Sequence, residues 1–415
     1  MKAIPRSKKS RLSSGSAFSK APTGWILLAC IGLIALNMRG PFVAVAPVAG
    51  AMQRELGFSP VELGLLTGIP VLCFSLGSPL ASFAGRRFGA EFAITLTLLG
   101  VLAGVIIRSA GSNALVMLGT GIIGVAITIG NIAVPLIIRR DFAPRRQSSA
   151  MGIYTAALNI GSFVTSMVTA PIAEVAGWRI SLAFAGLFAV TAMVFWILAV
   201  GARGVFRPRP AESGVKAAAA VRPASRWITA GLTVGFAGQA FSYYGVTAWL
   251  PTLLADELGM APSAAGAGSS LFQILAIVGG LGVPLAARFA STTAVAVTLG
   301  LLWLAVPLGL LFAPQLWWLW CSFGGVAQGG GITIIFVAII RLARDQASAG
   351  SMSALVQGIG YCFAAAAPTL LGYVHGATAS WTAPLLMILC SVAAFFLGTV
   401  LSVRQVPKQQ VPRQR

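Results

Sequence analysis

The stretch LIALNMRGPFVAVAP, residues 33–47, places one arginine inside a long apolar segment. Arg39 is the only charged residue between Trp25 and Met52, a run of 28 residues. As a helix, this run would be about 42 Å long at ~1.5 Å per residue, enough to cross a hydrocarbon layer of ~30 Å. The sequence therefore predicts a membrane-spanning helix with a charge near its middle, where an unpaired charge is costly.

The composition of the whole chain agrees with this prediction. Hydrophobic residues make up 57% of the 415 residues and charged residues only 9%. Soluble domains carry about 25% charged residues, so the composition excludes a soluble protein. We expect an all-α membrane protein with twelve transmembrane helices. The apolar segments lie near residues 25–50, 62–84, 91–110, 114–138, 148–173, 180–200, 227–251, 264–287, 292–312, 316–340, 351–374 and 382–402.

The net charge of +20 is explained by the positions of the basic residues. If the N-terminus is cytoplasmic, all but four of the 29 Lys and Arg residues fall in cytoplasmic tails and loops. Arg39 lies within the membrane, and Arg54, Arg108 and Arg179 are assigned to the outer side. This is the positive-inside pattern. We therefore expect both termini in the cytoplasm, basic tails that contact the lipid bilayer, and no nucleic-acid partner.

The chain divides into two similar halves. Residues 202–226 are rich in Pro, Ala and basic residues and separate six apolar segments from six. RELGFSP (54–60) recurs as DELGMAP (256–262), and GWRISLAF (177–184) corresponds to SWTAPLLM (380–387). Such repeats place a substrate site near the midplane, between the halves. The first predicted unit, residues 1–201, is a six-helix bundle with a basic cytoplasmic tail. Residues 202–226 form a cytoplasmic linker. The last unit, residues 227–415, is a second six-helix bundle with a cytoplasmic tail.

Several motifs resemble a known family. They are LNMRGPF in the first span, GNIAVPLIIRRDF ending the fourth, FSYYGVTAWLPTLL in the seventh and SLFQILAI in the eighth. The chain resembles the major facilitator superfamily and, within it, the cyanate permease and nitroimidazole transporter family. This resemblance implies the major facilitator fold and a secondary transporter in the cytoplasmic (inner) membrane of a bacterium. The solute would be small and polar or anionic (cyanate-, nitro- or carboxylate-like) and would move by alternating access; a multidrug or nitroimidazole efflux transporter is the alternative. We expect a monomer.

The resemblance also identifies candidate gating residues. In the superfamily, the loop after the second span usually carries an aspartate before a G-R-R run, but here Ser82 stands near that position. Arg86 and Arg87 remain as part of a cytoplasmic latch, or else they serve topology and lipid binding. A substitute latch is predicted further along the chain, at Arg139, Arg140 and Asp141.

Arg39 needs a partner, and none of the nine Asp and Glu residues lies at its depth. One possible partner is the backbone. Pro41 has no N–H, so together with Gly40 it is expected to break the helix and free the carbonyl of Asn37. The other is an anionic substrate, because a guanidinium presents forked donors that suit a carboxylate or nitro group.

Other polar side chains inside the spans are substrate-binding candidates, because an amide facing lipid is costly. The amides fall only on spans that border the central cavity in the fold implied by the resemblance, although each could instead hold two helices together. Tyrosines near them are further candidates, with helix packing as the alternative. The set is Arg39, Asn37, Asn131, Tyr154, Asn159, Gln239, Tyr243, Tyr244, Gln273, Gln328, Gln357 and Tyr361.

Enzymatic chemistry is not expected. The membrane interior carries no His, Asp or Glu for acid–base catalysis, and the chain has no HExxH motif or phosphate-binding loop. Its five cysteines lack CxxC spacing. We predict no catalytic residue, no metal and no cofactor, whereas a channel or a non-transporting receptor stays open as an alternative.

Overall fold

The computed structural model describes residues 24–77, 87–201, 205, 226–343 and 346–405, and the regular elements in these ranges are all helical. Long apolar sequences form helices in a membrane because a helix satisfies its backbone hydrogen bonds internally. The first half contains α1 (Gly24–Leu36), α2 (Gly40–Val43), η1 (Ala46–Val48), α3 (Ala49–Leu56), α4 (Pro60–Leu76), α6 (Ala90–Ser109), α7 (Asn113–Asp141) and α8 (Pro144–Val200). The second half contains α10 (Arg226–Leu258), α11 (Pro262–Ala286), α12 (Thr292–Phe312), η2 (Pro314–Leu316), α13 (Trp317–Leu342), α14 (Gln346–Thr378) and α15 (Thr382–Val403).

These elements can be matched to the twelve predicted spans. Within the described ranges, nine helical segments are long and apolar enough to span a membrane. One of them, α8, contains two helices, because Gly177 interrupts it with a φ of 83°. The shorter apolar helix α4 and the 33-residue helix α10 complete the set. The predicted fold class is confirmed.

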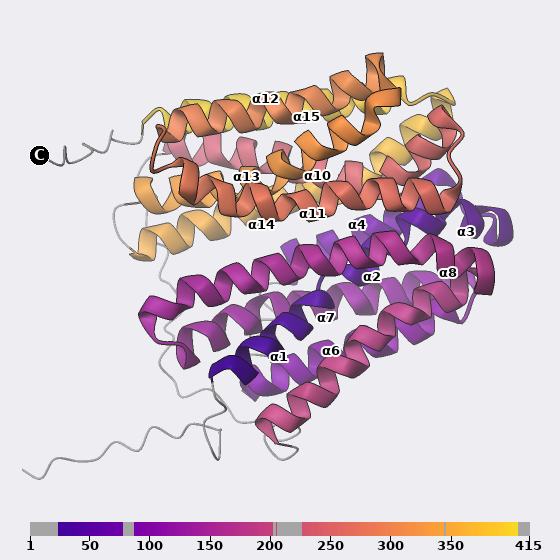
Figure 1. Cartoon of the computed structure of the whole chain (residues 1–415), viewed down its shortest axis with the longest axis horizontal. Coiled ribbons are helices and arrows are strands. Elements are labelled where there is room, and N and C mark those ends of the chain that lie inside the picture. The colour runs from indigo at the N-terminus through magenta and orange to yellow at the C-terminus, as the bar shows by residue number, and fades with distance from the viewer. Residues whose placement is uncertain (1–23, 78–86, 202–204, 206–225, 344–345, 406–415) are drawn as a thin grey trace, which may run out of the picture.

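The helices of the two halves form two groups that lie side by side (Figure 1). The start of α1 and the end of α15 lie at the same end of the molecule, at the left of the figure. Most of the predicted linker, both terminal tails and Arg86 lie outside the described residues.

The two groups meet where small residues allow close approach. Helix α4 packs along α14, and α8 packs along α11. A Cβ atom built on Gly64 of α4 would lie 2.5 Å from the carbonyl oxygen of Pro368 in α14. Across the second contact, the hydroxyls of Ser166 and Ser269 are 2.9 Å apart. Such contacts are typical of helix pairs in membranes, where apolar side chains gain little by leaving lipid.

The repeated motifs make equivalent contacts in the two halves. The indole N–H of Trp178 donates to Glu55 Oε2 at 2.6 Å. In the second half, the indole N–H of Trp381 donates to Asp256 Oδ2 at 3.0 Å. In each half, therefore, the start of the last span is tied to the end of the first span by a tryptophan–carboxylate hydrogen bond.

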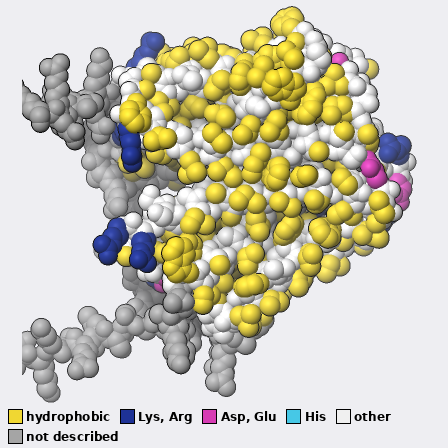
Figure 2. Space-filling model, in the orientation of Figure 1, with side chains coloured by type: hydrophobic (Ala, Val, Ile, Leu, Met, Phe, Trp, Pro, Cys, Tyr) yellow, Lys and Arg dark blue, Asp and Glu magenta, His cyan; other side chains and the backbone are white. Residues whose placement is uncertain are grey.

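The surface agrees with a membrane environment. Figure 2 shows a wide face covered mainly by hydrophobic side chains. On this face, Lys and Arg side chains gather mainly at the end where the described chain begins and ends, and Asp and Glu side chains lie mainly at the opposite end. An apolar band between two charged ends is the arrangement that a bilayer imposes.

Candidate functional site

The site is built around a break in the first span. Helix α1 ends at Leu36, a turn follows, and α2 begins at Gly40 with Pro41 in its first turn. Gly40 is needed there because a Cβ atom would lie 2.7 Å from Thr165 Oγ1 of α8. Arg39 therefore stands at the start of α2, at the interruption expected from Gly40 and Pro41.

Arg39 is partly buried and extends toward both halves of the molecule. Its Nη1 donates to Asn159 Oδ1 of α8 at 3.1 Å. Its Cζ atom lies 5.3 Å from the ring centroid of Tyr243 of α10, a cation–π distance. Among the described residues, the bond to Asn159 is the only side-chain hydrogen bond that the guanidinium makes. Most of its five N–H donors thus have no partner among the described residues.

Aromatic rings surround this charge. The rings of Tyr243 and Tyr244 are 4.8 Å apart, and Tyr244 lies 6.5 Å from Tyr361 of α14. Phe42 of α2 and Phe236 of α10 extend the cluster, at 6.0 Å from Tyr244 and 5.2 Å from Tyr361. Three predicted tyrosines from two helices of the second half therefore meet beside the arginine of the first half. We call these five rings the aromatic cluster.

Two hydroxyl groups add polar capacity to the site. The hydroxyl of Tyr243 is buried and makes no hydrogen bond with the described residues. The hydroxyl of Tyr154 donates to Asn131 Oδ1 at 3.1 Å. In the first half, therefore, Asn159 contacts Arg39 directly, and Asn131 and Tyr154 form a second polar pair between α7 and α8.

Three of the predicted amides contact neighbouring backbone instead. Asn37 donates to the carbonyls of Leu33 and Phe188, at 2.9 and 3.0 Å, and so ties the break to the second part of α8. Gln239 donates to the carbonyl of Gln328 at 2.9 Å, and Gln328 donates to that of Phe272 at 3.4 Å. Both glutamines are almost completely buried. In this structure these amides connect helices, and their part in substrate binding stays a prediction.

Two further predicted glutamines bond to hydroxyl groups. Gln273 of α11 donates to Thr247 Oγ1 of α10 at 3.3 Å. Gln357 donates to Ser353 Oγ, one turn earlier in α14, at 2.8 Å. Neither makes a hydrogen bond to Arg39 in the described structure.

One arginine makes a contact that the sequence did not predict. Arg108, in the last turn of α6, has a side chain that is fully buried in the N-terminal half. Its Nη1 donates to the carbonyl oxygen of Pro41 at 2.6 Å. Sequence analysis missed this contact because Arg108 ends an apolar helix, the usual position of a residue at a membrane surface. The only feature of the sequence that pointed to a buried Arg108 was its position directly after the apolar residues of α6.

The described residues give Arg39 and Arg108 no acidic partner and form no metal site. In the described ranges, no carboxylate forms an ion pair with Arg39 or Arg108. Within the same ranges, no group of three or more His, Cys, Asp or Glu side chains is placed to hold a metal ion. The site therefore presents positive charge, amides and aromatic faces.

Comparison with known proteins identifies the family. Residues 26–367 match the Major Facilitator Superfamily, and this match covers most of the chain. The chain belongs to the Major Facilitator Superfamily. It is 30% identical to an uncharacterized transporter of Bacillus subtilis, over 90% of this chain and 92% of the relative. It is 30% identical to the 2-nitroimidazole transporter of Escherichia coli, over 87% and 91% of the two chains, and 25% identical to the cyanate transport protein of that organism, over 86% and 91%.

Solved structures support the fold. A bacterial homolog of the human lysosomal transporter Spinster, in an inward-facing, occupied conformation, gives a TM-score of 0.67 at 18% identity. The match covers 93% of this chain and 94% of that chain. This member of the Major Facilitator Superfamily is a secondary transporter of a small solute, as the sequence predicted, and its relatives are transporters rather than enzymes.

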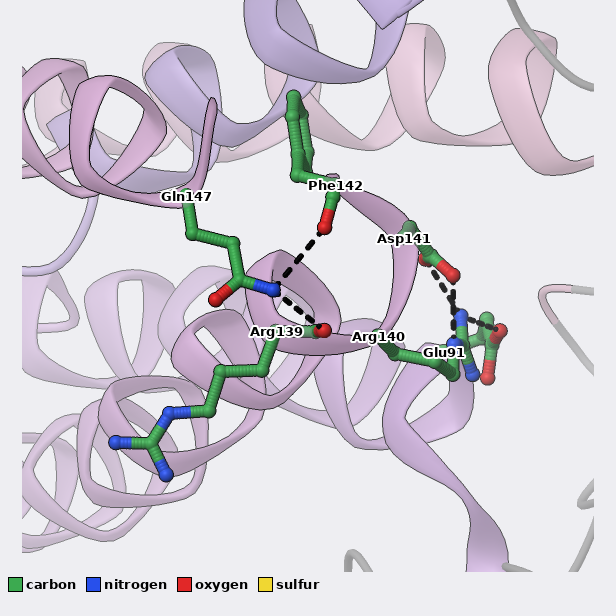
Figure 3. A network of polar contacts seen from close by, with 6 residues as sticks. All are labelled: Glu91, Arg139, Arg140, Asp141, Phe142 and Gln147. Atoms are coloured by element: carbon green, nitrogen blue, oxygen red, sulfur yellow. Dashed lines mark hydrogen bonds and ion pairs between the residues drawn. The ribbon is translucent and has the colours of Figure 1, made fainter. Parts of the chain in front are cut away.

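Two of the predicted latch residues, Arg140 and Asp141, form a network with Glu91 within the first half of this transporter (Figure 3). Arg140 makes two 2.8 Å bonds to the carboxylate of Asp141 and one 2.6 Å bond to Glu91 of α6. The guanidinium of Arg139 points away from this network, and its carbonyl accepts a bond from Gln147. The remaining described latch residue, Arg87, is exposed. The hydrogen bonds of this cluster connect α6, α7 and α8, and the contact of Glu91 with Arg140 was not predicted from the sequence.

A histidine cluster lies at the end of α14. His375 stacks on Trp381, with ring centroids 3.9 Å apart, and its Nε2 lies 3.8 Å from Asp256. The indole N–H of Trp249 donates to the carbonyl of Pro368 at 2.7 Å. His375 is thus a packed residue beside the second tryptophan–carboxylate contact.

Proposed function

We propose that the chain transports a small planar anion, or a strongly dipolar nitro- or cyanate-like solute, and that Arg39 is its principal binding residue. The observation that carries this proposal is a partly buried guanidinium with one protein acceptor, Asn159, and unused donors. A planar, singly charged group could accept two parallel bonds from such a fork. The absence of an ion-paired carboxylate among the described residues favours an anion over a cation.

The aromatic cluster supplies the rest of the proposed recognition. Ring faces favour a flat solute, and the unpaired hydroxyl of Tyr243 offers a polar contact. Asn159 and the pair of Asn131 and Tyr154 would position the solute from the first half. Two relatives, the 2-nitroimidazole transporter and the cyanate transport protein, carry small solutes of this kind by name.

The proposed mechanism is alternating access between two rigid halves. Residues 1–201 and 227–415 would rock about the solute, with 202–226 as their linker. Arg39 lies in the first half, while Tyr243, Tyr244 and Tyr361 lie in the second. A solute bound to both sides would stabilise their approach, and the contacts of α4 with α14 and of α8 with α11 would change as the halves move.

Purified protein can test this function directly. Cyanate, nitrate, 2-nitroimidazole and small carboxylates are titrated in a thermal-shift assay, and a true ligand raises the melting temperature by mass action. A ligand at about 100 times its Kd should add about 2.7 kcal/mol to the free energy of unfolding. The same solute should show saturable counterflow in proteoliposomes. If no member of this set shifts melting or exchanges, the proposed substrate class is wrong.

The proposed location is the cytoplasmic membrane of a bacterium, as a monomer with both termini inside. Reporter fusions test this topology. A fusion at Gly214 in the linker should report a cytoplasmic position, and one at Gly376, near the end of α14, should report the outer side. Matching signals at the two positions would contradict the topology.

A further inference from the structure

Arg108 caps the broken first span from the neighbouring helix α6. Its side chain is fully buried, and its Nη1 lies 2.6 Å from the carbonyl oxygen of Pro41. Helix α7 holds it closely, since a Cβ atom on Gly119 would lie 2.6 Å from the backbone nitrogen of Arg108. The backbone from which the arginine extends is therefore held tightly against α7.

The carbonyl that it caps has left the helical hydrogen-bond ladder. In a continuous α-helix, the amide of Val45 would donate to the carbonyl of Pro41, four residues earlier. Here it donates to the carbonyl of Phe42 at 3.4 Å. The change of partner leaves the oxygen of Pro41 available to Arg108. A charged donor makes a stronger bond to such a carbonyl than a neutral donor does.

The buried guanidinium of Arg108 is not expected to stabilise the fold. Its Nε and Nη2 atoms are buried and have no hydrogen-bond partner within the described structure. Buried polar groups without partners destabilise a protein, and an apolar side chain of similar volume is often better tolerated. A role in setting the geometry of the break explains this residue better than a role in stability.

We propose that Arg108 is a positioning residue for Arg39. Arg39 precedes α2, and its carbonyl accepts the amide of Val43 at 3.2 Å. By holding the carbonyl of Pro41, Arg108 fixes this one-turn helix and so directs Arg39 toward Asn159 and Tyr243. Arg108 does not contact the solute, because it is fully buried. The effect on binding rests on the proposed function, whereas the effect on α2 does not.

Two measurements on Arg108→Met test this role. Hydrogen exchange of the substrate-free protein should speed up at the amides of residues 42–48, with little change elsewhere. The probe that stabilises the wild type, cyanate, nitrate or 2-nitroimidazole, should bind about tenfold more weakly. The melting temperature without ligand should stay the same or rise, since two unpaired buried groups are removed. Arg108→Lys keeps the charge, so its exchange rates at residues 42–48 and its affinity for the probe should lie between those of the wild type and Arg108→Met.

Arg341→Met is the matched control, because Arg341 also bonds to a neighbouring helix, through Thr292 Oγ1 at 2.8 Å, but lies in the second half. It should leave exchange at residues 42–48 unchanged. Unchanged exchange there in Arg108→Met would overturn the proposal, as would a lowered melting temperature with normal affinity. If Arg108→Met does not fold, the same readouts on Arg108→Lys decide. If no probe binds even to the wild type, the proposed function fails, and the exchange measurement still decides the role of Arg108.

Discussion

Arg39→Gln is expected to weaken binding of the stabilising anion by about 10- to 100-fold, the range for a lost charge-assisted hydrogen bond. Arg39→Lys keeps the charge but loses the planar fork, so its affinity should lie between those of the wild type and the glutamine variant. The melting temperature without ligand should be retained or raised in Arg39→Gln, because a partly buried charge is removed.

This combination distinguishes a ligand site from a structural clamp. If Arg39 mainly holds the break together through Asn159, both substitutions should lower the melting temperature of the empty protein, and the folded fraction should bind normally. Such a result would remove Arg39 from the substrate site. Arg404→Gln is the control, because Arg404 is exposed at the end of α15. Its loss should change neither the affinity for the anion nor the melting temperature.

Gly64→Ala should have the second large effect, because its new methyl group would meet the backbone of α14. A Cβ atom there would lie 2.6 Å from the Cα of Thr369 and 2.5 Å from the oxygen of Pro368. The backbone cannot move aside as a side chain can. We therefore expect the free energy of unfolding of the described arrangement to fall by about 1–3 kcal/mol. Counterflow should slow, because one of the proposed access states depends on this contact.

Gly121→Ala provides the comparison for this glycine. Gly121 lies in α7, and nothing lies within 4 Å of a Cβ built on it. Its replacement by alanine should be neutral or stabilise the helix by up to ~1 kcal/mol. Thermal unfolding and counterflow of the two variants check the prediction. Equal behaviour would show that the contact of α4 with α14 does not limit stability or transport.

The position of the break could be read from the sequence, but its supporting contacts could not. Pro41 lacks an N–H and Gly40 lacks a side chain, so an interruption near residue 40 follows from local chemistry. The capping residue comes from α6, far along the chain. Arg108 looked like a membrane-surface residue because hydropathy reports depth only along one helix and says nothing about its neighbours.

The contacts of the amide side chains also could not be predicted from the sequence. Their presence on spans 1, 4, 5, 7, 8, 10 and 11 was visible in the sequence. Whether an amide meets a backbone carbonyl, as Asn37 and Gln239 do, or borders Arg39, as Asn159 does, depends on the rotation of each helix. That rotation is fixed by the packing of side chains between helices. The polar network of Glu91 with Arg140 was hidden for the same reason.

The sequence by itself determined the membrane class, the twelve crossings, the superfamily and the single arginine at mid-depth. The superfamily was indicated by a resemblance in motifs such as LNMRGPF. The membrane class, the spans and the arginine within the first span follow from the free energy of placing each residue in lipid, which depends on composition along one segment at a time. Only the tertiary structure decided that Tyr243, Tyr244 and Tyr361 surround that arginine, and that Arg108 caps the break beside it. Buried polar groups take the partner that packing brings within about 3 Å, and a linear pattern does not contain that distance.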